Sequence, residues 1–341
     1  MKIAIDAMGG DYAPDAIIHG GVEAARLGKG DYEVVFVGDE SIVKAQLSRH
    51  FRVHELPIEV CHASQKIEMG EAPTVALKTK PDASISVAMR LHRERQVDAV
   101  ISAGHTGAAM ASALFSLGRI EGVKRPAIGS LVPHAQGGTL LIDVGANLDC
   151  KPMHLLQFGI MGSLYMQDVF NIPSPRVALL NVGTEKSKGN EVRQVAHKLL
   201  DTCGLNFVGN IEGRDVMGGD IDVIVSDGFV GNVVLKFAES FNGVYSKTLK
   251  RKIGKKVFSK VGAFLLKPTF DRLRRIYDYE EYGGAPLLGI DGTCIICHGS
   301  STPKAIKNAV KEAAMMIKKR VNQKIRTELS GLREERDGKH Y

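Results

Sequence analysis

Short apolar segments alternate with helical patterns along most of this 341-residue chain. A turn rich in glycine, asparagine or aspartate follows each apolar segment, and a helical pattern comes next. The apolar segments are 2–5, 33–37, 97–102, 140–144, 177–182 and 223–226. Strands that alternate with helices form right-handed crossover units and a mostly parallel sheet with helices on both faces. We therefore expect an α/β protein of three layers, α/β/α.

The length allows one large domain or two lobes. Because there is no internal repeat, low-complexity stretch or clear linker, we expect a single domain over 1–330 and a polar C-terminal tail over 331–341. The last helix is expected to begin near Pro303. No apolar run approaches 18 residues and the N-terminus has no signal-peptide core, so we expect neither a membrane-spanning helix nor export.

The positive charge of the chain is concentrated in one segment. The net charge is +7, but residues 247–275 contain eleven basic residues and a single acid, Asp271. That window alone is +10, and the rest of the chain is −3. Apolar residues recur there at helical spacing until Lys267-Pro268 interrupts the pattern. We predict two short amphipathic helices joined at Pro268, which form a basic hairpin over 247–276.

This hairpin has several interpretations. It could be a solvated face over a core helix, a contact for an anionic membrane surface, or a contact for an acidic protein partner. Nucleic acid fits least, because stacking platforms interleave aromatic residues with the basic ones, and we expect no nucleic acid partner. The predicted membrane or carrier contacts are Lys255, Lys256, Val257, Lys260, Val261, Phe264, Leu265, Leu266, Arg272 and Arg275.

Six polar loops follow the predicted strands, where ligands bind in open α/β sheets. Any single loop is explained by a glycine turn or a helix N-cap. Six together indicate an anion site built from N–H groups at helix N-termini, to which Lys188 adds charge, and phosphate is the expected anion. The candidate binding residues are Asp6, Gly9, Gly10, Gly104, His105, Thr106, Gly107, Asp143, Thr184, Lys186, Asn190, Asp227, His298 and Ser300.

Several familiar reaction types lack their motifs in this sequence. There is no G-x-x-x-x-G-K-[ST] or G-x-G-x-x-G string, no residue set with convincing metal spacing, and no serine in G-x-S-x-G. A covalent nucleophile is therefore not visible. A reaction in which phosphate itself attacks needs none.

Six ordered strings resemble the bacterial phosphate acyltransferase family. They are 5–11, 141–147, 181–185, 227–232, 282–285 and 298–301, within a match that runs from residue 3 to about 320. One departure is His105, where the family more usually has asparagine.

The resemblance implies an enzyme that makes acyl phosphate from acyl-[acyl carrier protein] and inorganic phosphate, at the start of phospholipid synthesis. It implies a fold similar to isopropylmalate dehydrogenase and phosphotransacetylase, a homodimer, and no metal or organic cofactor. It also implies a cytoplasmic enzyme, peripherally associated with the inner face of the cell membrane. Such an enzyme passes its product to a membrane glycerol-3-phosphate acyltransferase.

For the reaction we predict three catalytic residues, Lys188, Asn147 and Asn232. Lys188 would pair with phosphate or the oxyanion, and Lys186 is the alternative cation. Thr106 is a further neutral donor, and the carboxylates of Asp143 and Asp227 would hold these donors in place. His298 could protonate the departing thiolate, but a thiolate leaves readily, so a structural role is expected.

Three other functions remain open at this point. The nearest is a short-chain phosphotransacetylase that acts on acyl-CoA. The others are a hydroxyacid dehydrogenase of the isopropylmalate type, which would need aspartates for a metal and a nicotinamide site, and a non-catalytic membrane adaptor that uses the basic hairpin.

Overall fold

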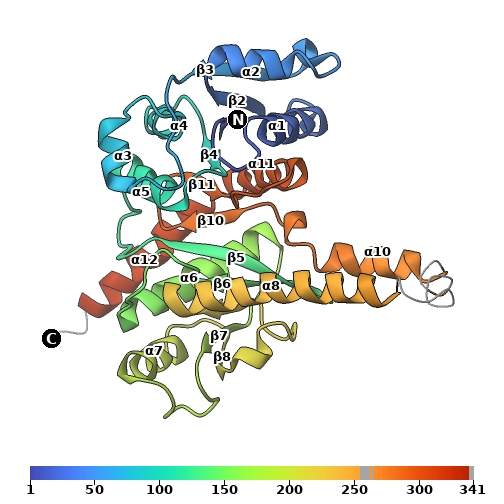
Figure 1. The fold of residues 1–341 in the computed structure, drawn as a ribbon. Helices are drawn as coiled ribbons and strands as arrows, with labels where there is room; N and C mark the ends of the chain where they lie inside the picture. The colour runs from blue at the N-terminus through green and yellow to red at the C-terminus, as the bar shows by residue number, and fades with distance from the viewer. Residues whose placement is uncertain (254–261, 263–264, 338–341) are drawn as a thin grey trace. The chain divides into compact units, whose positions relative to one another are not determined.

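The computed structural model describes residues 1–253, 262 and 265–337 (Figure 1). The chain packs as two compact units, although its sequence predicts one domain. Unit 1 consists of 1–129, 160–173 and 280–341, and unit 2 of 130–159 and 174–279. The chain passes from one unit to the other within strand β5 (Ala127–His134) and within helix α6 (Pro152–Val169). No linker composition marks these two crossings, because they fall inside regular elements. The chain crosses again at 173–174, between α6 and β7, and at 279–280.

The strands of unit 1 follow the order β3-β2-β1-β4-β11-β10-β5. Strands β3, β2, β1, β4 and β11 are parallel, and β10 runs antiparallel to both of its neighbours. The bounds are β1 Lys2–Asp6, β2 Glu33–Gly38, β3 Ile58–His62, β4 Ala99–Ser102, β10 Ala285–Leu288 and β11 Thr293–Ile296. Their apolar side chains, such as Ile3, Ile5 and Ile101, are fully buried, as expected for strands covered on both faces.

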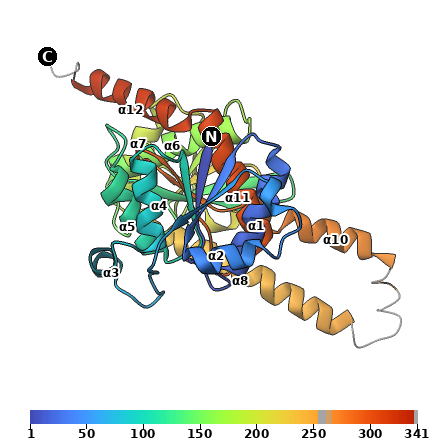
Figure 2. The ribbon, with the colours of Figure 1, turned by 90° about the horizontal axis from the view of Figure 1, so that it is seen from above.

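Helices cover both faces of this part of the sheet. Figure 2 shows α1, α2 and α11 on one side of the strands and α4 and α5 on the other. The helices of unit 1 are α1 Asp15–Gly28, α2 Glu40–Leu47, α3 Pro73–Thr79, α4 Ser84–Arg93, α5 Thr106–Leu117, α11 Pro303–Lys318 and α12 Val321–Asp337, together with the end of α6.

In unit 2 the strand order is β5-β6-β9-β7-β8, and the strands from β6 onward are parallel. Helix α8 packs against β6, and α7 packs against β8. The bounds are β6 Gly137–Ile142, β7 Val177–Leu180, β8 Phe207–Ile211, β9 Val223–Val225, α7 Glu191–Asp201, α8 Gly228–Ile253 and α10 Lys267–Ile276. The predicted fold class, a mostly parallel α/β sheet with flanking helices, is confirmed.

The C-terminal part differs from its prediction. Helix α11 ends at Lys318, Arg320 is left-handed with φ of 55°, and α12 then continues to Asp337. Residues 331–337 of the predicted tail are therefore helical, whereas 338–341 lie outside the described residues. The physical reason is a stripe of Val321, Ile325 and Leu329, spaced by four residues and buried.

The basic hairpin also differs from its prediction. Its first arm is the end of α8, which is 26 residues long, and Pro268 lies in the first turn of α10 instead of joining two helices. Proline is tolerated there because the first N–H groups of a helix have no intrahelical partner. Figures 1 and 2 show α8 and α10 side by side. None of the described helices combines the length and apolar character needed to span a bilayer.

The structure describes only some of the predicted hairpin contacts. Leu265, Leu266 and Arg272 are exposed, and Arg275 belongs to α10. Six predicted contacts lie outside the described residues: Lys255, Lys256, Val257, Lys260, Val261 and Phe264.

Candidate active site

In unit 1, Asp6 connects the loops that follow β1 and β4. The Ser102 hydroxyl donates a hydrogen bond to Asp6 Oδ2 at 2.7 Å and accepts one from the Gly104 N–H at 3.1 Å. The Met8 N–H donates to Asp6 Oδ1 at 3.3 Å. Burial raises the pKa of the Asp6 carboxyl, and hydrogen bonds from Ser84 and Ser102 oppose that rise. Asp6 is therefore a buried group that positions loops.

Two predicted glycines allow these loops to approach each other. A Cβ atom on Gly9 would lie 2.5 Å from Asp6 Oδ2 and 2.8 Å from the backbone nitrogen of Gly104. Gly10 has a φ of 121°, and the next residue, Asp11, donates its N–H to the Gly299 carbonyl of the loop after β11. Three strand ends thus meet at this edge of unit 1, as the sequence predicts.

A small pocket of about 10 Å³ lies between these loops, enough for one water molecule or one ligand oxygen. Its lining includes Lys66 and Ser84, which were not predicted. Lys66 follows β3, a strand that the sequence analysis does not predict. The loop after β3 is therefore not among the predicted binding loops. The alternation of apolar Ile58 and Val60 with charged Glu59 is the sequence signal for this strand.

His105 is the N-cap of α5. Its Nδ1 accepts hydrogen bonds from the backbone N–H groups of Gly107, at 3.1 Å, and Ala108, at 3.4 Å. Asparagine, which the resemblance implies at this position, is also a favoured N-cap, so either residue can cap the helix. Thr106 and Gly107 form the first turn of the helix. The cap leaves Nε2 as the ring nitrogen that can reach a ligand.

At the end of β11, His298 and Ser300 bond to each other. His298 Nδ1 lies 2.7 Å from Ser300 Oγ and also accepts the Ser300 N–H at 3.2 Å. Thr302 is the N-cap residue of α11, but its hydroxyl donates to Glu280 Oε2 at 2.9 Å instead of capping the helix. A side chain that closes its own turn in this way fits the structural role expected of His298.

In unit 2, the buried carboxylate of Asp143 organises the loop after β6. Its Oδ1 accepts the N–H groups of Gly145 and Ala146, at 3.2 and 3.0 Å. Its Oδ2 accepts the backbone N–H of Asn147 at 2.7 Å and the Asn147 side-chain amide at 2.9 Å. The carboxylate thus holds Asn147 through both its backbone N–H and its side-chain amide, as the sequence predicts.

The start of α8 packs directly on this loop. A Cβ atom on Gly231 would overlap the Asp143 carbonyl oxygen, and one on Gly228 would lie 2.7 Å from the Asn147 carbonyl oxygen. The Gly228 N–H donates to that second oxygen at 2.7 Å. The contact brings Asn232 beside the loop, with its amide carbon 3.9 Å from the Cβ position of Gly145.

Asp227 holds an arginine that the sequence did not single out. Arg193 Nη2 lies 2.6 Å from Asp227 Oδ2, and Arg193 Nε donates to the Leu180 carbonyl at 3.3 Å. The other carboxylate oxygen accepts the Val230 N–H. Asp227 therefore fixes Arg193 and the first turn of α8. The two partners are 34 residues apart, and no local pattern links them.

The loop after β7 fixes the backbone of Lys188. The Glu185 carbonyl accepts the Lys188 N–H at 3.1 Å and the buried Asn210 side-chain amide at 2.9 Å. The Asn181 side-chain amide donates to the Lys188 carbonyl at 3.1 Å. His197 Nδ1 lies 3.0 Å from Asn210 Oδ1. Buried amides thus support the main chain of an exposed lysine from two sides.

The other predicted residues of this loop have different surroundings. Lys186 pairs with Asp201 at 3.0 Å, with both side chains largely exposed. Asn190 is the N-cap of α7 and accepts the Arg193 N–H at 3.1 Å. Thr184 is exposed. Because β6, β9 and β7 are neighbours in that order, the loops that carry Asn147 and Lys188 share one edge of unit 2 with the start of α8, which carries Asn232.

Comparison with known proteins identifies the family. A model described as "Fatty acid synthesis protein" matches residues 1–324. A phosphate acyltransferase of Pelotomaculum thermopropionicum is 50% identical over 332 residues, 97% of this chain and 96% of the relative. One of Dictyoglomus turgidum is 48% identical over 327 residues, 95% of this chain and 96% of the relative.

Solved structures show the same fold at low sequence identity. A phosphotransacetylase from Streptococcus pyogenes has a TM-score of 0.62 at 17% identity and covers 93% of this chain and 94% of its own. A structure described as a putative 4-hydroxythreonine-4-phosphate dehydrogenase from Salmonella typhimurium has a TM-score of 0.52 at 13% identity. It covers 92% of this chain and 99% of its own. With the curated relatives, they confirm the predicted resemblance and fold: the chain belongs to the phosphate acyltransferase family and is an acyl-transferring enzyme.

Proposed function

We propose that this enzyme transfers a fatty acyl group from the thioester of an acyl-[acyl carrier protein] to inorganic phosphate, as an early step of phospholipid synthesis. The observation that carries the proposal is the fixed loop of Lys188. A lysine that only adds charge to the surface needs no hydrogen bonds from buried side-chain amides to fix the backbone of its loop. Its loop lies at the same edge as two asparagines, and a cation beside neutral donors suits a phosphate that meets a carbonyl group.

In the proposed reaction a phosphate oxygen attacks the thioester carbon. The new carbon–oxygen bond forms, the carbon–sulfur bond breaks, and its electron pair leaves on the carrier thiolate, which takes a proton from solvent. Lys188 neutralises the bound phosphate, while Asn147 and Asn232 donate to the oxyanion. Holding the reactants together lowers the barrier by roughly 7–11 kcal/mol. One well-placed oxyanion donor adds about 3–4 kcal/mol.

Arg193 is the other strong cation near this edge, but Asp227 neutralises it. We assign it the task of positioning α8 and the loop after β7. Lys186 is likewise engaged with Asp201, whereas Lys188 makes no side-chain ion pair within the part of the chain that the structure describes. These contacts favour Lys188 over Lys186 as the phosphate partner.

The test is acyl phosphate formation from a long-chain acyl-[acyl carrier protein] and phosphate, with EDTA present. Turnover supports the proposal. Turnover with acetyl-CoA alone would instead indicate a short-chain phosphotransacetylase, and inactivity with both substrates would contradict the proposal. Lys188→Ala should lower the rate at least a hundredfold with an unchanged melting temperature. Lys198→Ala, at another exposed lysine, serves as the matched control and should keep the parent rate. If Lys186→Ala lowers the rate as much as Lys188→Ala does, Lys188 is not the specific phosphate partner.

The charge distribution supports the partners that the resemblance implies. The +10 segment over 247–275 suits both the acidic carrier protein and an anionic membrane surface. We include in the proposal a peripheral position on the inner face of the cell membrane, from which the reactive product passes to a membrane glycerol-3-phosphate acyltransferase. Cosedimentation with anionic and neutral vesicles tests it, and equal binding to both would contradict it.

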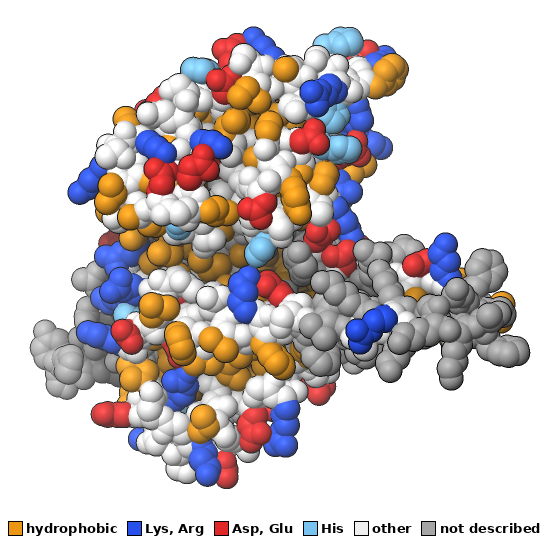
Figure 3. Space-filling model, viewed as in Figure 1, with side chains coloured by type: hydrophobic (Ala, Val, Ile, Leu, Met, Phe, Trp, Pro, Cys, Tyr) orange, Lys and Arg blue, Asp and Glu red, His pale blue; other side chains and the backbone are white. Residues whose placement is uncertain are grey.

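A homodimer is part of the proposal. On α8, Phe229, Val233 and Phe237 are spaced by four residues and are 62%, 56% and 70% exposed. Figure 3 shows hydrophobic side chains gathered over this helix. An exposed apolar stripe of this kind suits a helix of a second copy. Sedimentation of Phe237→Glu should show monomers, and an unchanged mass would place any dimer contact elsewhere.

A further inference from the structure

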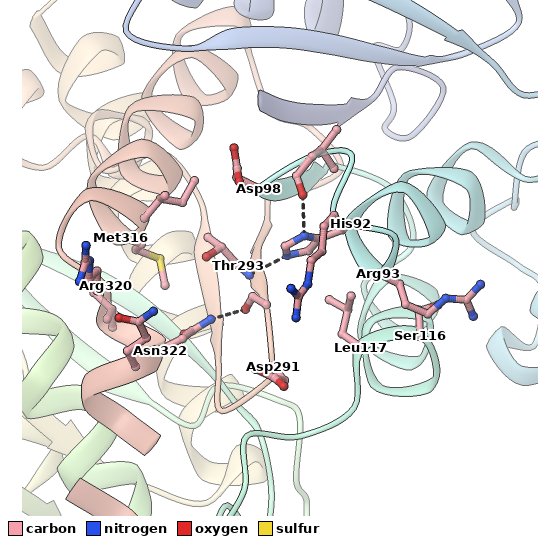
Figure 4. Close-up of a pocket in the computed structure, with 16 residues that line it drawn as sticks. His92, Arg93, Asp98, Ser116, Leu117, Asp291, Thr293, Met316, Arg320 and Asn322 are labelled. Atoms are coloured by element: carbon pink, nitrogen blue, oxygen red, sulfur yellow. Dashed lines mark hydrogen bonds between the residues drawn. The ribbon is translucent and has the colours of Figure 1, made fainter. Parts of the chain in front are cut away.

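Unit 1 contains a second pocket, at the edge of its sheet opposite to the candidate active-site loops (Figure 4). Asp98, just before β4, and Thr293, the first residue of β11, both line it. The active-site loops, by contrast, follow the last residues of these strands. The pocket has a volume of about 460 Å³, within the range of small-molecule sites.

Three arginines line this pocket. Arg93 and Arg95 come from the end of α4, and Arg320 comes from the connection between α11 and α12. Figure 4 shows Arg93 and Arg320 on opposite sides of the pocket. The side chains of Arg95 and Arg320 form no hydrogen bond or ion pair with the described residues. Two guanidinium groups are therefore available to a ligand.

The two acids of the lining already have partners. Asp98 Oδ2 accepts the backbone N–H of Lys2 at 2.7 Å, and Asp291 forms an ion pair with Arg326. The lining thus has an excess of positive charge, and its unengaged charges are cationic.

The remaining wall is neutral or apolar. His92 Nδ1 lies 3.0 Å from the Val97 carbonyl, and its Nε2 accepts the Thr293 N–H at 2.9 Å, as Figure 4 shows. Burial lowers the pKa of His92, so the ring stays neutral near pH 7. Apolar contact area comes from Val97, Leu117, Met316, Ile317 and Val321.

Helix ends account for part of this arrangement. Cations are favoured at helix C-termini, and α4, α5 and α11 all end here. Arg95 and Arg320 have φ values of 58° and 55°, in the left-handed region where glycine usually follows a helix. A helix end explains one basic residue. It does not explain a cavity of this size with unpaired arginines from two separate connections.

We propose that this pocket binds a small organic anion, a phosphate or carboxylate group attached to an apolar body. The planar guanidinium groups of Arg95 and Arg320 bind the anionic group through paired N–H donors. The apolar body packs on Leu117, Met316 and Ile317. This site is separate from the candidate active site and does not depend on the proposed function.

The test uses a local signal that does not require turnover. In the full-length protein with ¹³C-labelled methionine methyl groups, the Met316 resonance is assigned with Met316→Leu and followed during titration with phenyl phosphate. We expect a saturable shift, with a dissociation constant at least tenfold higher in the Arg95→Ala/Arg320→Ala double variant. Arg214→Ala, an exposed arginine in unit 2, should bind as the parent does. Melting temperatures confirm that the variants fold.

Further probes identify the recognised group. Phenol lacks the anion and inorganic phosphate lacks the apolar body, so both should bind at least tenfold more weakly than phenyl phosphate. Phenylacetate shows whether a carboxylate serves as well as a phosphate. The proposal is overturned if neither phenyl compound shifts Met316 saturably, if the double variant binds as the parent does, or if phenol binds as tightly. Lys188→Ala must retain binding, since its loss would mean that the signal reports the active site.

Discussion

Glu312 is a fully buried acid that the proposed reaction does not use, and replacing it gives a quantitative test of the structure. Its Oε1 accepts the Tyr165 hydroxyl at 2.6 Å, and its Oε2 accepts the Gly284 N–H at 3.3 Å. Burial raises the pKa of Glu312 to about 8, against 4.5 for an exposed glutamate, and these two hydrogen bonds oppose the rise. The perturbation is Glu312→Gln, which keeps the shape and cannot ionise.

The magnitude follows from proton linkage. Between pH 4.5 and about 8 the folded protein retains a proton on Glu312 that the unfolded chain has lost. The free energy of unfolding therefore falls as the pH rises through this window, by about 1.4 kcal/mol per unit. Above pH 8 the accumulated loss is roughly 5 kcal/mol, a large part of a typical protein's stability. The Glu312→Gln substitution removes this loss and weakens a hydrogen bond, at a cost of about 1 kcal/mol.

The assay is urea unfolding of the full-length parent and Glu312→Gln at pH 5, 7 and 9. The variant should equal the parent or be slightly less stable at pH 5, and it should be more stable by several kcal/mol at pH 9. Glu121→Gln, at an exposed glutamate, is the control and should show no such crossover. A stability difference between parent and Glu312→Gln that stays constant from pH 5 to pH 9 would refute the reasoning.

Three further predictions concern the candidate active site. Gly231→Ala should abolish activity and destabilise unit 2 by about 1–3 kcal/mol, because the added methyl group overlaps a carbonyl oxygen; activity and melting temperature are measured. Asn210→Ala should lower the rate of acyl phosphate formation at least tenfold in the parent and hardly at all in a Lys188→Ala background, since it acts by positioning that lysine. His105→Asn should retain stability within ~0.5 kcal/mol, whereas His105→Ala should lose about 1 kcal/mol with the cap, as thermal unfolding will show.

Matched controls separate these effects from general damage. Gly213 has open space at its Cβ position and an ordinary φ, so Gly213→Ala should be neutral. Asn206 donates to the Ser174 carbonyl in an exposed setting away from the Lys188 loop, so Asn206→Ala should leave the rate unchanged. If Asn210→Ala lowers the rate equally with and without Lys188, its role is general stability and not positioning.

The parts of the fold that sequence reasoning recovered are those encoded over short distances. The predicted apolar runs 2–5, 33–37, 97–102, 140–144, 177–182 and 223–226 each overlap a strand with a parallel neighbour, namely β1, β2, β4, β6, β7 and β9. Fully buried strands are continuous apolar runs, which a single sequence displays directly. The edge strand β3 was missed because its side chains are partly exposed and its pattern mixes charge with apolar residues.

Most of the roles within the site depend on partners far along the chain. Asp143 and Asn147 are four residues apart, and their contact was predicted. Arg193 and Asp227 are not neighbours in sequence, and neither the ion pair nor its effect on α8 was anticipated. His105 was selected as an anion ligand, whereas its Nδ1 is used by the helix that it precedes.

Some glycines are only partly predictable: the sequence shows that a constraint exists, and a distant part of the chain imposes it. The sequence places Gly228 and Gly231 among the first residues of a helical pattern, and inside a helix glycine is unfavourable by roughly 1 kcal/mol relative to alanine. That cost indicates a constraint, but the sequence does not name the group that imposes it. The structure supplies it: the carbonyl oxygens of Asp143 and Asn147, more than eighty residues earlier, occupy the space of a side chain. An unfavourable glycine in a helix therefore predicts a close backbone approach, and here the approach is what brings Asn232 to the loop of Asn147.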